Sequence, residues 1–244
     1  MTELNLDTPV GLWVAERPNT SRVFEAFHID FCCGGDKPLV AACAAGNIDP
    51  EQVFAELENA MAGPPAEGEA GRWINASLTE LCDHIEQTHH AYLKSELPRL
   101  HGMIAKVRGA HGASHPEMLD VQQAFAALEA ELAPHMFKEE QVLFPAIRRL
   151  EASDAPPAFP FGTVANPIRM MEHEHDNAGD ALDRIRRAAH DFAVPEDACN
   201  TYRAMLDGLR QLELDMHQHF HKENNVLFPR AIQLEETRNR VLRQ

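Results

Sequence analysis

Two segments of this chain place a histidine and a glutamate four residues apart. The segment HMFKEEQVLFP covers 135–145 and HFHKENNVLFP covers 219–229, so one pattern occurs twice. The pairs are His135 with Glu139 and His219 with Glu223. On an α-helix, residues i and i+4 share a face, so an imidazole and a carboxylate can meet at one point. The apolar Val-Leu-Phe that follows each pair indicates that this face is turned into a core.

Each copy is preceded by a further histidine, His84 before the first and His175 before the second. Two helical hairpins of this pattern, packed antiparallel, bring four imidazoles and two carboxylates to one level of a four-helix bundle. Bundle cores of this kind hold two-metal carboxylate sites. The predicted metal ligands are therefore His84, His135, Glu139, His175, His219 and Glu223.

Helix geometry leaves the neighbouring histidines out of this set. His89 and His90 follow His84 by five and six residues, and about 100° of rotation per residue turns them away from its face. His173 points nearly opposite to His175 for the same reason. Glu174 precedes His175 and has two interpretations: a hydrogen-bond partner for an imidazole N–H beside the metals, or a solvated surface carboxylate.

The predicted ligand set contains nitrogen and oxygen donors and no sulfur. Such a set suits iron or manganese better than structural zinc. Divided between two metals, it gives each ion two imidazoles and one carboxylate, with open positions for dioxygen or nitric oxide. Carboxylates that bridge both metals would hold them roughly 3.5–4 Å apart. A single His-x3-Glu is more often a surface pair, but two copies in matching VLFP frames favour the metal site.

The five cysteines do not form a disulfide framework, because their number is odd. A reducing cytoplasm is therefore the expected location. Cys32 and Cys33 precede Gly34-Gly35, which should leave both sulfurs accessible. They are either a redox or metal-transfer thiol pair or ordinary cysteines at a turn. The other three lie in helical patterns and are predicted to be small apolar core residues: Cys43, Cys82 and Cys199.

Length and charge narrow the function classes. The chain has 244 residues and a net charge of −16. This charge argues against a nucleic-acid partner, which needs a basic stripe, and against an anionic membrane surface. No apolar run is long enough to span a membrane, and the N-terminus lacks the basic start and apolar region of a signal peptide.

Helix signals predict an all-α fold in two parts. Residues 1–62 form a small helical domain that contains the Cys-Cys-Gly-Gly motif, and 63–76 form a linker rich in proline and glycine. Ser77 and Glu80 make a capping box that starts the second part. Residues 77–244 are predicted to form the four-helix bundle that carries the metal ligands.

At this point the chain resembles the iron–sulfur cluster repair di-iron proteins, also called repair of iron centres proteins. The resemblance rests on VGLWVAERP, IDFCCGG, LCDHI, HMFKEEQVLFP, MEHEHDNAG and HFHKENNVLFP, and covers nearly the whole chain. It implies a hemerythrin-like bundle with two non-haem iron ions, bridged by oxide or hydroxide. The implied ligands are the same six residues, and the match at Glu-His-Asp selects His175 over His173.

The resemblance also implies a function in the cytoplasm, as a homodimer. Members of the family are linked to the recovery of iron–sulfur proteins after nitrosative and oxidative stress, so damaged or apo iron–sulfur proteins are the expected partners. Cys32 and Cys33 match the family's cysteine pair and become expected functional thiols. Three activities fit such a site: iron donation to damaged clusters, reduction of nitric oxide to nitrous oxide, and hemerythrin-type binding or sensing of dioxygen or nitric oxide.

Overall fold

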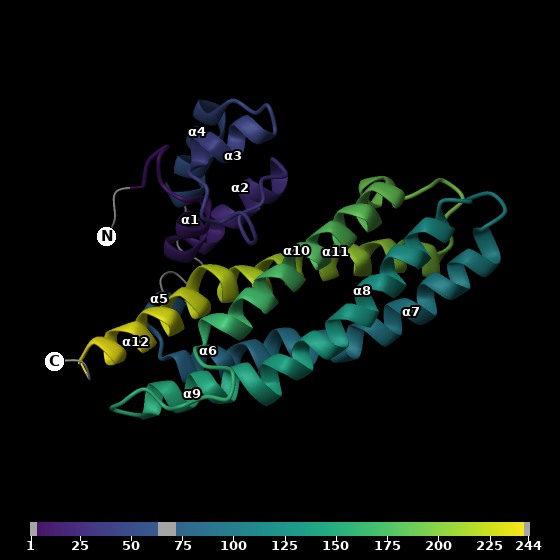
Figure 1. The fold of residues 1–244 in the computed structure, drawn as a ribbon. Helices are drawn as coiled ribbons and strands as arrows, with labels where there is room; N and C mark the ends of the chain where they lie inside the picture. Colours follow the sequence, from purple (N-terminus) through teal and green to yellow (C-terminus); the bar gives the residue numbers. More distant parts are fainter. Residues whose placement is uncertain (1–3, 63–71, 242–244) are drawn as a thin grey trace. The chain divides into compact units, whose positions relative to one another are not determined.

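The computed structural model describes residues 4–62 and 72–241. Across these residues the regular secondary structure is helical, and the only β-type pairings are isolated bridges between Pro9 and Pro38 and between Phe159 and Gly162. The predicted all-α fold is confirmed (Figure 1). No helix in the described part of the chain combines the length and apolar character that crossing a bilayer requires.

The chain divides into two compact units that do not follow the sequence order. The first comprises Met1–Cys82, Ile147–Ala165 and His217–Gln244, and the second comprises Asp83–Ala146 and Asn166–Met216.

The N-terminal part of the first unit is a set of short helices around a small apolar core. The helices are α1 (Val10–Glu16), η1 (Pro18–Thr20), α2 (Ser21–Ala26), α3 (Leu39–Ala45) and α4 (Pro50–Ala62). Their fully buried side chains include Trp13, Phe24, Leu39 and Leu57. The Trp13 and Phe54 rings meet edge to face with centroids 5.7 Å apart, an arrangement that aromatic pairs favour.

The chain enters the bundle through α5 (Arg72–Asn75) and α6 (Leu78–Ile85). Residues 63–71 of the predicted linker lie outside the described residues. The predicted capping box is confirmed, because Ser77 N–H donates to Glu80 Oε2 (2.9 Å) and Glu80 N–H donates to Ser77 Oγ (3.1 Å). The Glu151 carboxylate adds a second cap by accepting hydrogen bonds from the N–H groups of Leu78 (2.7 Å) and Thr79 (2.9 Å).

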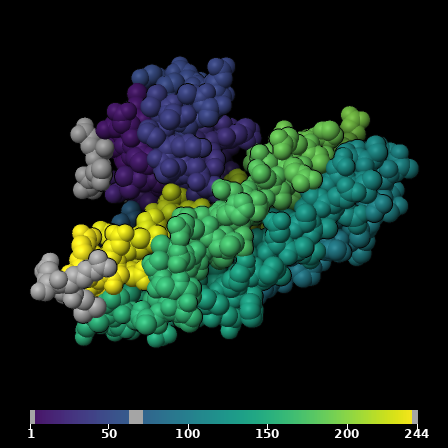
Figure 2. All heavy atoms as spheres, in the orientation of Figure 1, coloured from purple at the N-terminus to yellow at the C-terminus, as the bar shows by residue number. Residues whose placement is uncertain are grey.

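Four helices of 21 to 24 residues make up most of the second unit: α7, α8, α10 and α11. The remaining elements of the chain are η2 (Glu86–His90), α7 (Ala91–His111), α8 (Met118–Lys138), η3 (Glu139–Leu143), α9 (Phe144–Ala152), α10 (Ala165–Ala188), η4 (His190–Phe192), α11 (Asn200–Lys222), η5 (Glu223–Leu227) and α12 (Phe228–Val241). Helices α7 and α8 run side by side (Figure 1), and α10 lies beside α8 on the face drawn in Figure 2. A two-point ion pair joins α10 to α11: Arg186 Nε and one terminal nitrogen lie 2.9 and 2.8 Å from the buried Glu213 carboxylate.

Three π-helical turns interrupt the long helices: η2, η3 and η5. Two of them begin at the glutamates of the repeated motif, Glu139 and Glu223, and η2 ends at His90. A π-turn holds more residues than an α-turn and is frequently found at functional sites. The repeat is therefore a structural one, with a glutamate at the start of a π-turn in each copy.

Asn225, in η5, holds the Cys-Cys-Gly-Gly loop in place within the first unit. Its Nδ2 donates to the carbonyl oxygens of Cys32 (2.9 Å) and Phe31 (3.2 Å). The glycines beside it allow this approach, since a Cβ on Gly11 or Gly35 would collide with Asn225 Oδ1. The loop thus packs on the same π-turn that begins at Glu223.

We expect Gly35→Ala to lower the free energy of unfolding by about 1–3 kcal/mol, because the added methyl group collides with Asn225. Urea denaturation followed by tryptophan fluorescence measures the change, since the buried Trp13 lies in the same unit. Gly102→Ala is the control: it lies in α7 with nothing within 4 Å of a new Cβ, and it should stabilise the protein by about 0.5–1 kcal/mol. Equal stability of Gly35→Ala and the parent protein would contradict this packing.

Candidate metal centre

Imidazole and carboxylate groups converge inside the second unit. His135 Nε2 lies 3.2 Å from Glu139 Oε2, and His90 Nε2 lies 3.3 Å from the same oxygen. His175 Nε2 is 3.2 Å from His135 Nε2. All four residues are buried, and Glu139 and His175 have no exposed surface. The ring nitrogens and the carboxylate therefore face one small volume in the buried core.

The second copy of the motif has the same local geometry. His219 Nε2 lies 3.2 Å from Glu223 Oε1, and neither residue has exposed surface. The equivalent distance in the first copy, between His135 and Glu139, is also 3.2 Å. The i,i+4 spacing thus produces the contact that it predicts in both copies.

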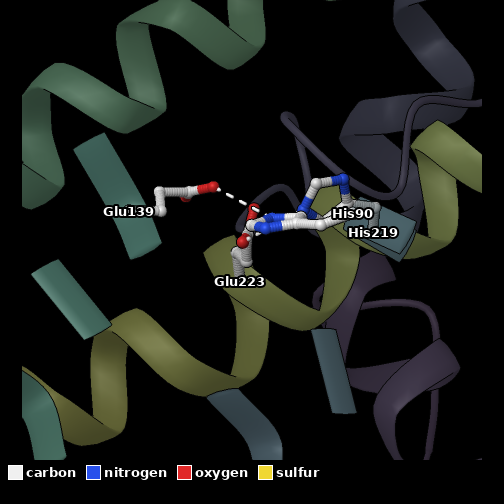
Figure 3. A group of neighbouring side chains, drawn as sticks. All are labelled: His90, Glu139, His219 and Glu223. Carbon is white, nitrogen blue, oxygen red and sulfur yellow. Dashed lines mark hydrogen bonds and ion pairs between the residues drawn. The ribbon is translucent and has the colours of Figure 1, made fainter. Parts of the chain in front are cut away.

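These side chains form two overlapping groups with the spacing of metal ligands. One consists of His90, Glu139, His219 and Glu223, and the other of His135, Glu139, His175 and Glu223. In each group, one ligand atom per residue lies within 4.8 Å of all the others. Figure 3 shows the first group, whose side chains point toward one another. Both groups contain the same two glutamates.

The chemistry of these donors fits a metal of the iron type. A buried carboxylate costs several kcal/mol unless a positive charge compensates it, and two of them are buried here. A divalent ion supplies that charge, and imidazole and carboxylate are ligands that iron accepts. The groups contain no thiolate, the ligand that many structural zinc sites use.

The structure places His90, which helix geometry had left out, in the position expected for His84. His90 contacts Glu139 at 3.3 Å, whereas His84 belongs to neither group and its Nδ1 lies 3.2 Å from Thr88 Oγ1. The expected rotation of about 100° per residue holds for an α-helix, but residues 86–90 form the π-turn η2. The sequence carries no direct signal for this turn. His173 is exposed, as predicted.

Two carboxylates orient the histidines from their outer side. Glu174 Oε2 lies 3.0 Å from His135 Nδ1, and Glu140 Oε1 lies 2.8 Å from His90 Nδ1. An Nδ1–H that donates outward leaves Nε2 to face the metal position. Glu174 also pairs with Lys138, and Glu140 with Lys94. The hydrogen bonds from His135 and Lys138 lower the pKa of Glu174 against the effect of burial, so this carboxylate stays charged.

Glu174→Gln is expected to weaken iron retention by roughly ten- to a hundredfold while leaving the fold intact, because the amide orients His135 less well. The rate at which a ferrous chelator removes iron from the loaded protein measures this effect. Glu172→Gln is the matched control, since Glu172 lies two residues earlier on α10 and is in neither group. Equal iron loss from the Glu174 variant and the control would show that the contact does not orient a ligand.

The Cys-Cys-Gly-Gly loop forms a third group of ligand type, composed of Asp30, Cys32 and Cys33. The Asp30 carboxylate accepts hydrogen bonds from three consecutive backbone N–H groups, those of residues 32–34, at 2.8–3.0 Å. The two sulfurs lie 3.9 Å apart and both are free thiols. The expectation that both would be accessible is wrong for Cys32, which is 6% exposed.

The loop holds Cys32 as a neutral thiol. A hydrogen bond with Cys33, burial and the nearby Asp30 raise its pKa well above the usual value. Thiols that react as nucleophiles sit instead in electropositive surroundings that lower the pKa. Cys32 is thus less suited to direct attack as a thiolate, and a metal that binds it has to displace its proton.

The core prediction for the other cysteines is confirmed for two and wrong for one. Cys43 and Cys82 have no exposed surface. Cys199 is exposed, because it lies immediately before α11 and not in its interior. The backbone N–H of Tyr202 and the His111 side chain lower the pKa of its thiol.

Comparison with protein families supports both parts of the chain. Residues 6–61 match the model of a domain of unknown function, DUF542. Residues 83–231 match the hemerythrin HHE cation binding domain. The second match agrees with the bundle and its buried histidine and glutamate groups.

Curated relatives cover nearly the whole chain. The iron-sulfur cluster repair protein YtfE of Escherichia coli O157:H7 is 36% identical over 226 residues, which is 93% of this chain and 97% of that protein. The proteins of the same name from Shigella boydii and Citrobacter koseri are 36% and 35% identical over the same shares.

Proposed function

Because this chain belongs to the family of iron–sulfur cluster repair proteins and contains a hemerythrin HHE cation binding domain, we propose that it restores iron–sulfur clusters damaged by nitrosative and oxidative stress. It does so by supplying ferrous iron from a labile two-iron centre. Iron is thus both the metal that the site binds and the cargo that it delivers. Damaged or apo iron–sulfur proteins are the acceptors.

The observation that carries the proposal is the pair of overlapping groups that contain the same two glutamates. His90 and His219 would hold one iron and His135 and His175 the other, and Glu139 and Glu223 are members of both groups. Each iron then has two imidazoles and access to two carboxylates. This ligand count leaves coordination positions open for an oxide or hydroxide bridge and for nitric oxide or dioxygen.

The imidazole and carboxylate donors suit the release of iron as well as its binding. Ferrous iron stands low in the affinity order of divalent metals, and imidazole and carboxylate ligands do not add the strong thiolate bonds of a structural site. Glu174 and Glu140 keep the outward ring nitrogens of His135 and His90 occupied, so these rings keep presenting Nε2 after iron leaves. The protein is therefore ready to be reloaded.

The proposal includes Cys32 and Cys33 as the thiols that bind iron on its way to the acceptor, or that give up two electrons to it as they become a disulfide. Their loop is held by Asn224 and Asn225, the two residues that follow Glu223. Asp30 completes a potential ligand set beside the two sulfurs. A change at Glu223 that moves η5 thus also moves the backbone contacts of Cys32.

We also propose that this activity takes place in the cytoplasm. All five cysteines are free thiols in the structure, which suits the reducing cytoplasm. We also propose a homodimer, on the basis of the family resemblance. Sedimentation equilibrium of the iron-loaded protein measures the mass directly, and a single species of 27.3 kDa would refute the dimer.

Transfer of labelled iron tests the function. Reduced protein loaded with ⁵⁷Fe is mixed with an apo-ferredoxin and sulfide, in the presence of a chelator that removes free ferrous iron. We expect Mössbauer spectra to show ⁵⁷Fe in the ferredoxin cluster at chelator concentrations that stop assembly from free ferrous iron. Transfer no faster than from the free ion would refute donation. Nitrous oxide from the diferrous protein and nitric oxide would instead identify a nitric oxide reductase.

A further inference from the structure

A second cluster of metal-binding side chains lies in the second unit, at the end where α7 stops and α8 and α11 begin. It consists of His111, His115 and Asp197, whose ligand atoms all lie within 4.8 Å of one another. His111 is the last residue of α7, and Asp197 lies three residues before α11. We call these three residues the loop cluster.

His115 is oriented as a metal-binding histidine is. Its Nδ1 lies 2.9 Å from Glu117 Oε1, and its Nε2 lies 3.0 Å from Asp197 Oδ1. An imidazole that donates from Nδ1 to a carboxylate presents the lone pair of Nε2, which is the carboxylate–histidine–metal arrangement of protein metal sites.

The two histidine rings are held by the fold. Tyr202 is buried, and its ring centroid lies 5.4 Å from those of both His111 and His115. The backbone N–H of His115 donates to the His111 carbonyl oxygen at 2.8 Å, which closes the turn between them. Gly112 permits this turn, because a Cβ there would lie 2.5 Å from the Arg108 carbonyl oxygen. The rings are thus positioned before any ion arrives.

A surface histidine elsewhere shows what an ordinary ion pair looks like in this protein. His101 Nδ1 lies 2.7 Å from Glu129 Oε2, on the exposed faces of α7 and α8, and this pair belongs to none of the groups of metal-ligand type among the described residues. The loop cluster differs from the His101–Glu129 pair in two ways. It contains a second imidazole, and the carboxylate of Glu117 orients His115 from outside the cluster.

We propose that His111, His115 and Asp197 form a second metal site, which binds a divalent first-row transition-metal ion and leaves coordination positions open to solvent. Two imidazoles and one carboxylate are a ligand set used for both zinc and ferrous iron. The site is independent of the two-iron centre, because it shares no residue with it. The thiol of Cys199 lies beside His111 and adjoins the set, but the site does not depend on it.

Zinc is the probe that tests the site, because it binds such ligands tightly and is not redox active. Tag-free, iron-loaded protein carrying Cys32→Ser and Cys33→Ser is titrated with Zn²⁺ by calorimetry, and iron and zinc are then measured in the desalted protein. The serines remove the thiol pair of the first unit, which would also take zinc. We expect one zinc per chain with the iron content unchanged.

Variants locate the zinc. Asp197→Asn or His111→Ala should abolish the saturable zinc, and Glu117→Gln should weaken it by about tenfold, because it only orients His115. His101→Ala is the matched control and should bind zinc as the parent does. The proposal is overturned if no zinc is retained, if zinc replaces an equal amount of iron, or if Asp197→Asn retains it. Circular dichroism of each variant establishes that the fold is kept.

Discussion

Glu139→Ala is expected to purify without iron and to stay without it after anaerobic reconstitution. Glu139 belongs to both histidine–glutamate groups and has no exposed surface, so its removal takes one carboxylate from each iron position. The loss in affinity should exceed the roughly ten- to hundredfold that removal of an outer hydrogen-bond partner costs. Metal analysis and Mössbauer spectroscopy of ⁵⁷Fe-reconstituted protein measure it.

The melting temperature of Glu139→Ala distinguishes loss of the metal site from loss of the fold. Iron that binds only the folded chain raises the melting temperature of the parent, and this rise should be absent in Glu139→Ala. The iron-free variant should melt at or above the temperature of the iron-free parent, because a buried carboxylate has been removed. Glu131→Ala, an exposed position on the same helix, is the control. Two irons bound to Glu139→Ala would refute the proposed centre.

His90→Ala and His84→Ala are expected to differ sharply. His90 has no exposed surface and contacts Glu139 at 3.3 Å, so its loss should remove most of the iron from one position. His84 is half-buried and lies outside both groups, so His84→Ala should keep its iron. The two residues are six positions apart on adjoining helical segments, which makes each the other's control.

The iron content and the Mössbauer spectra of the two variants show whether His90 or His84 is the metal ligand. A coupled pair of irons in His84→Ala, together with uncoupled or absent iron in His90→Ala, is the expected result. The reverse outcome would restore the ligand predicted from helix geometry and would mean that η2 does not place His90 at the metals. Removal of His84 also removes its contact with Thr88, so thermal melting of both variants checks the fold.

The i,i+4 pairs could be predicted from sequence because they depend on a local and regular geometry. Each histidine of the repeat lies on an α-helix, and its glutamate begins the following π-turn. Over four residues this change of helix type is too small to separate the side chains, and both pairs meet at 3.2 Å. The capping box at Ser77 and Glu80 is equally local and was predicted for the same reason.

Contacts between residues that are far apart in the sequence could not be predicted as reliably. Sequence reasoning left Glu174 open between an orienting carboxylate and a surface group, and its contact with His135 joins residues 39 positions apart. The helical pattern around Cys199 predicts a small apolar core residue. In the structure α11 begins at Asn200, one residue after Cys199, so the thiol lies outside the helix and is exposed.

Three features could be predicted from the sequence: the all-helical class, the repeated histidine–glutamate pairs, and a ligand chemistry that suits iron or manganese. These follow from residue chemistry and from a helix period that acts over a few residues. Two features depend on the tertiary structure. His90 rather than His84 contacts Glu139, and His111, His115 and Asp197 meet where α7 ends and α8 and α11 begin. Both depend on where π-turns and loops fall, and packing across the whole chain determines that.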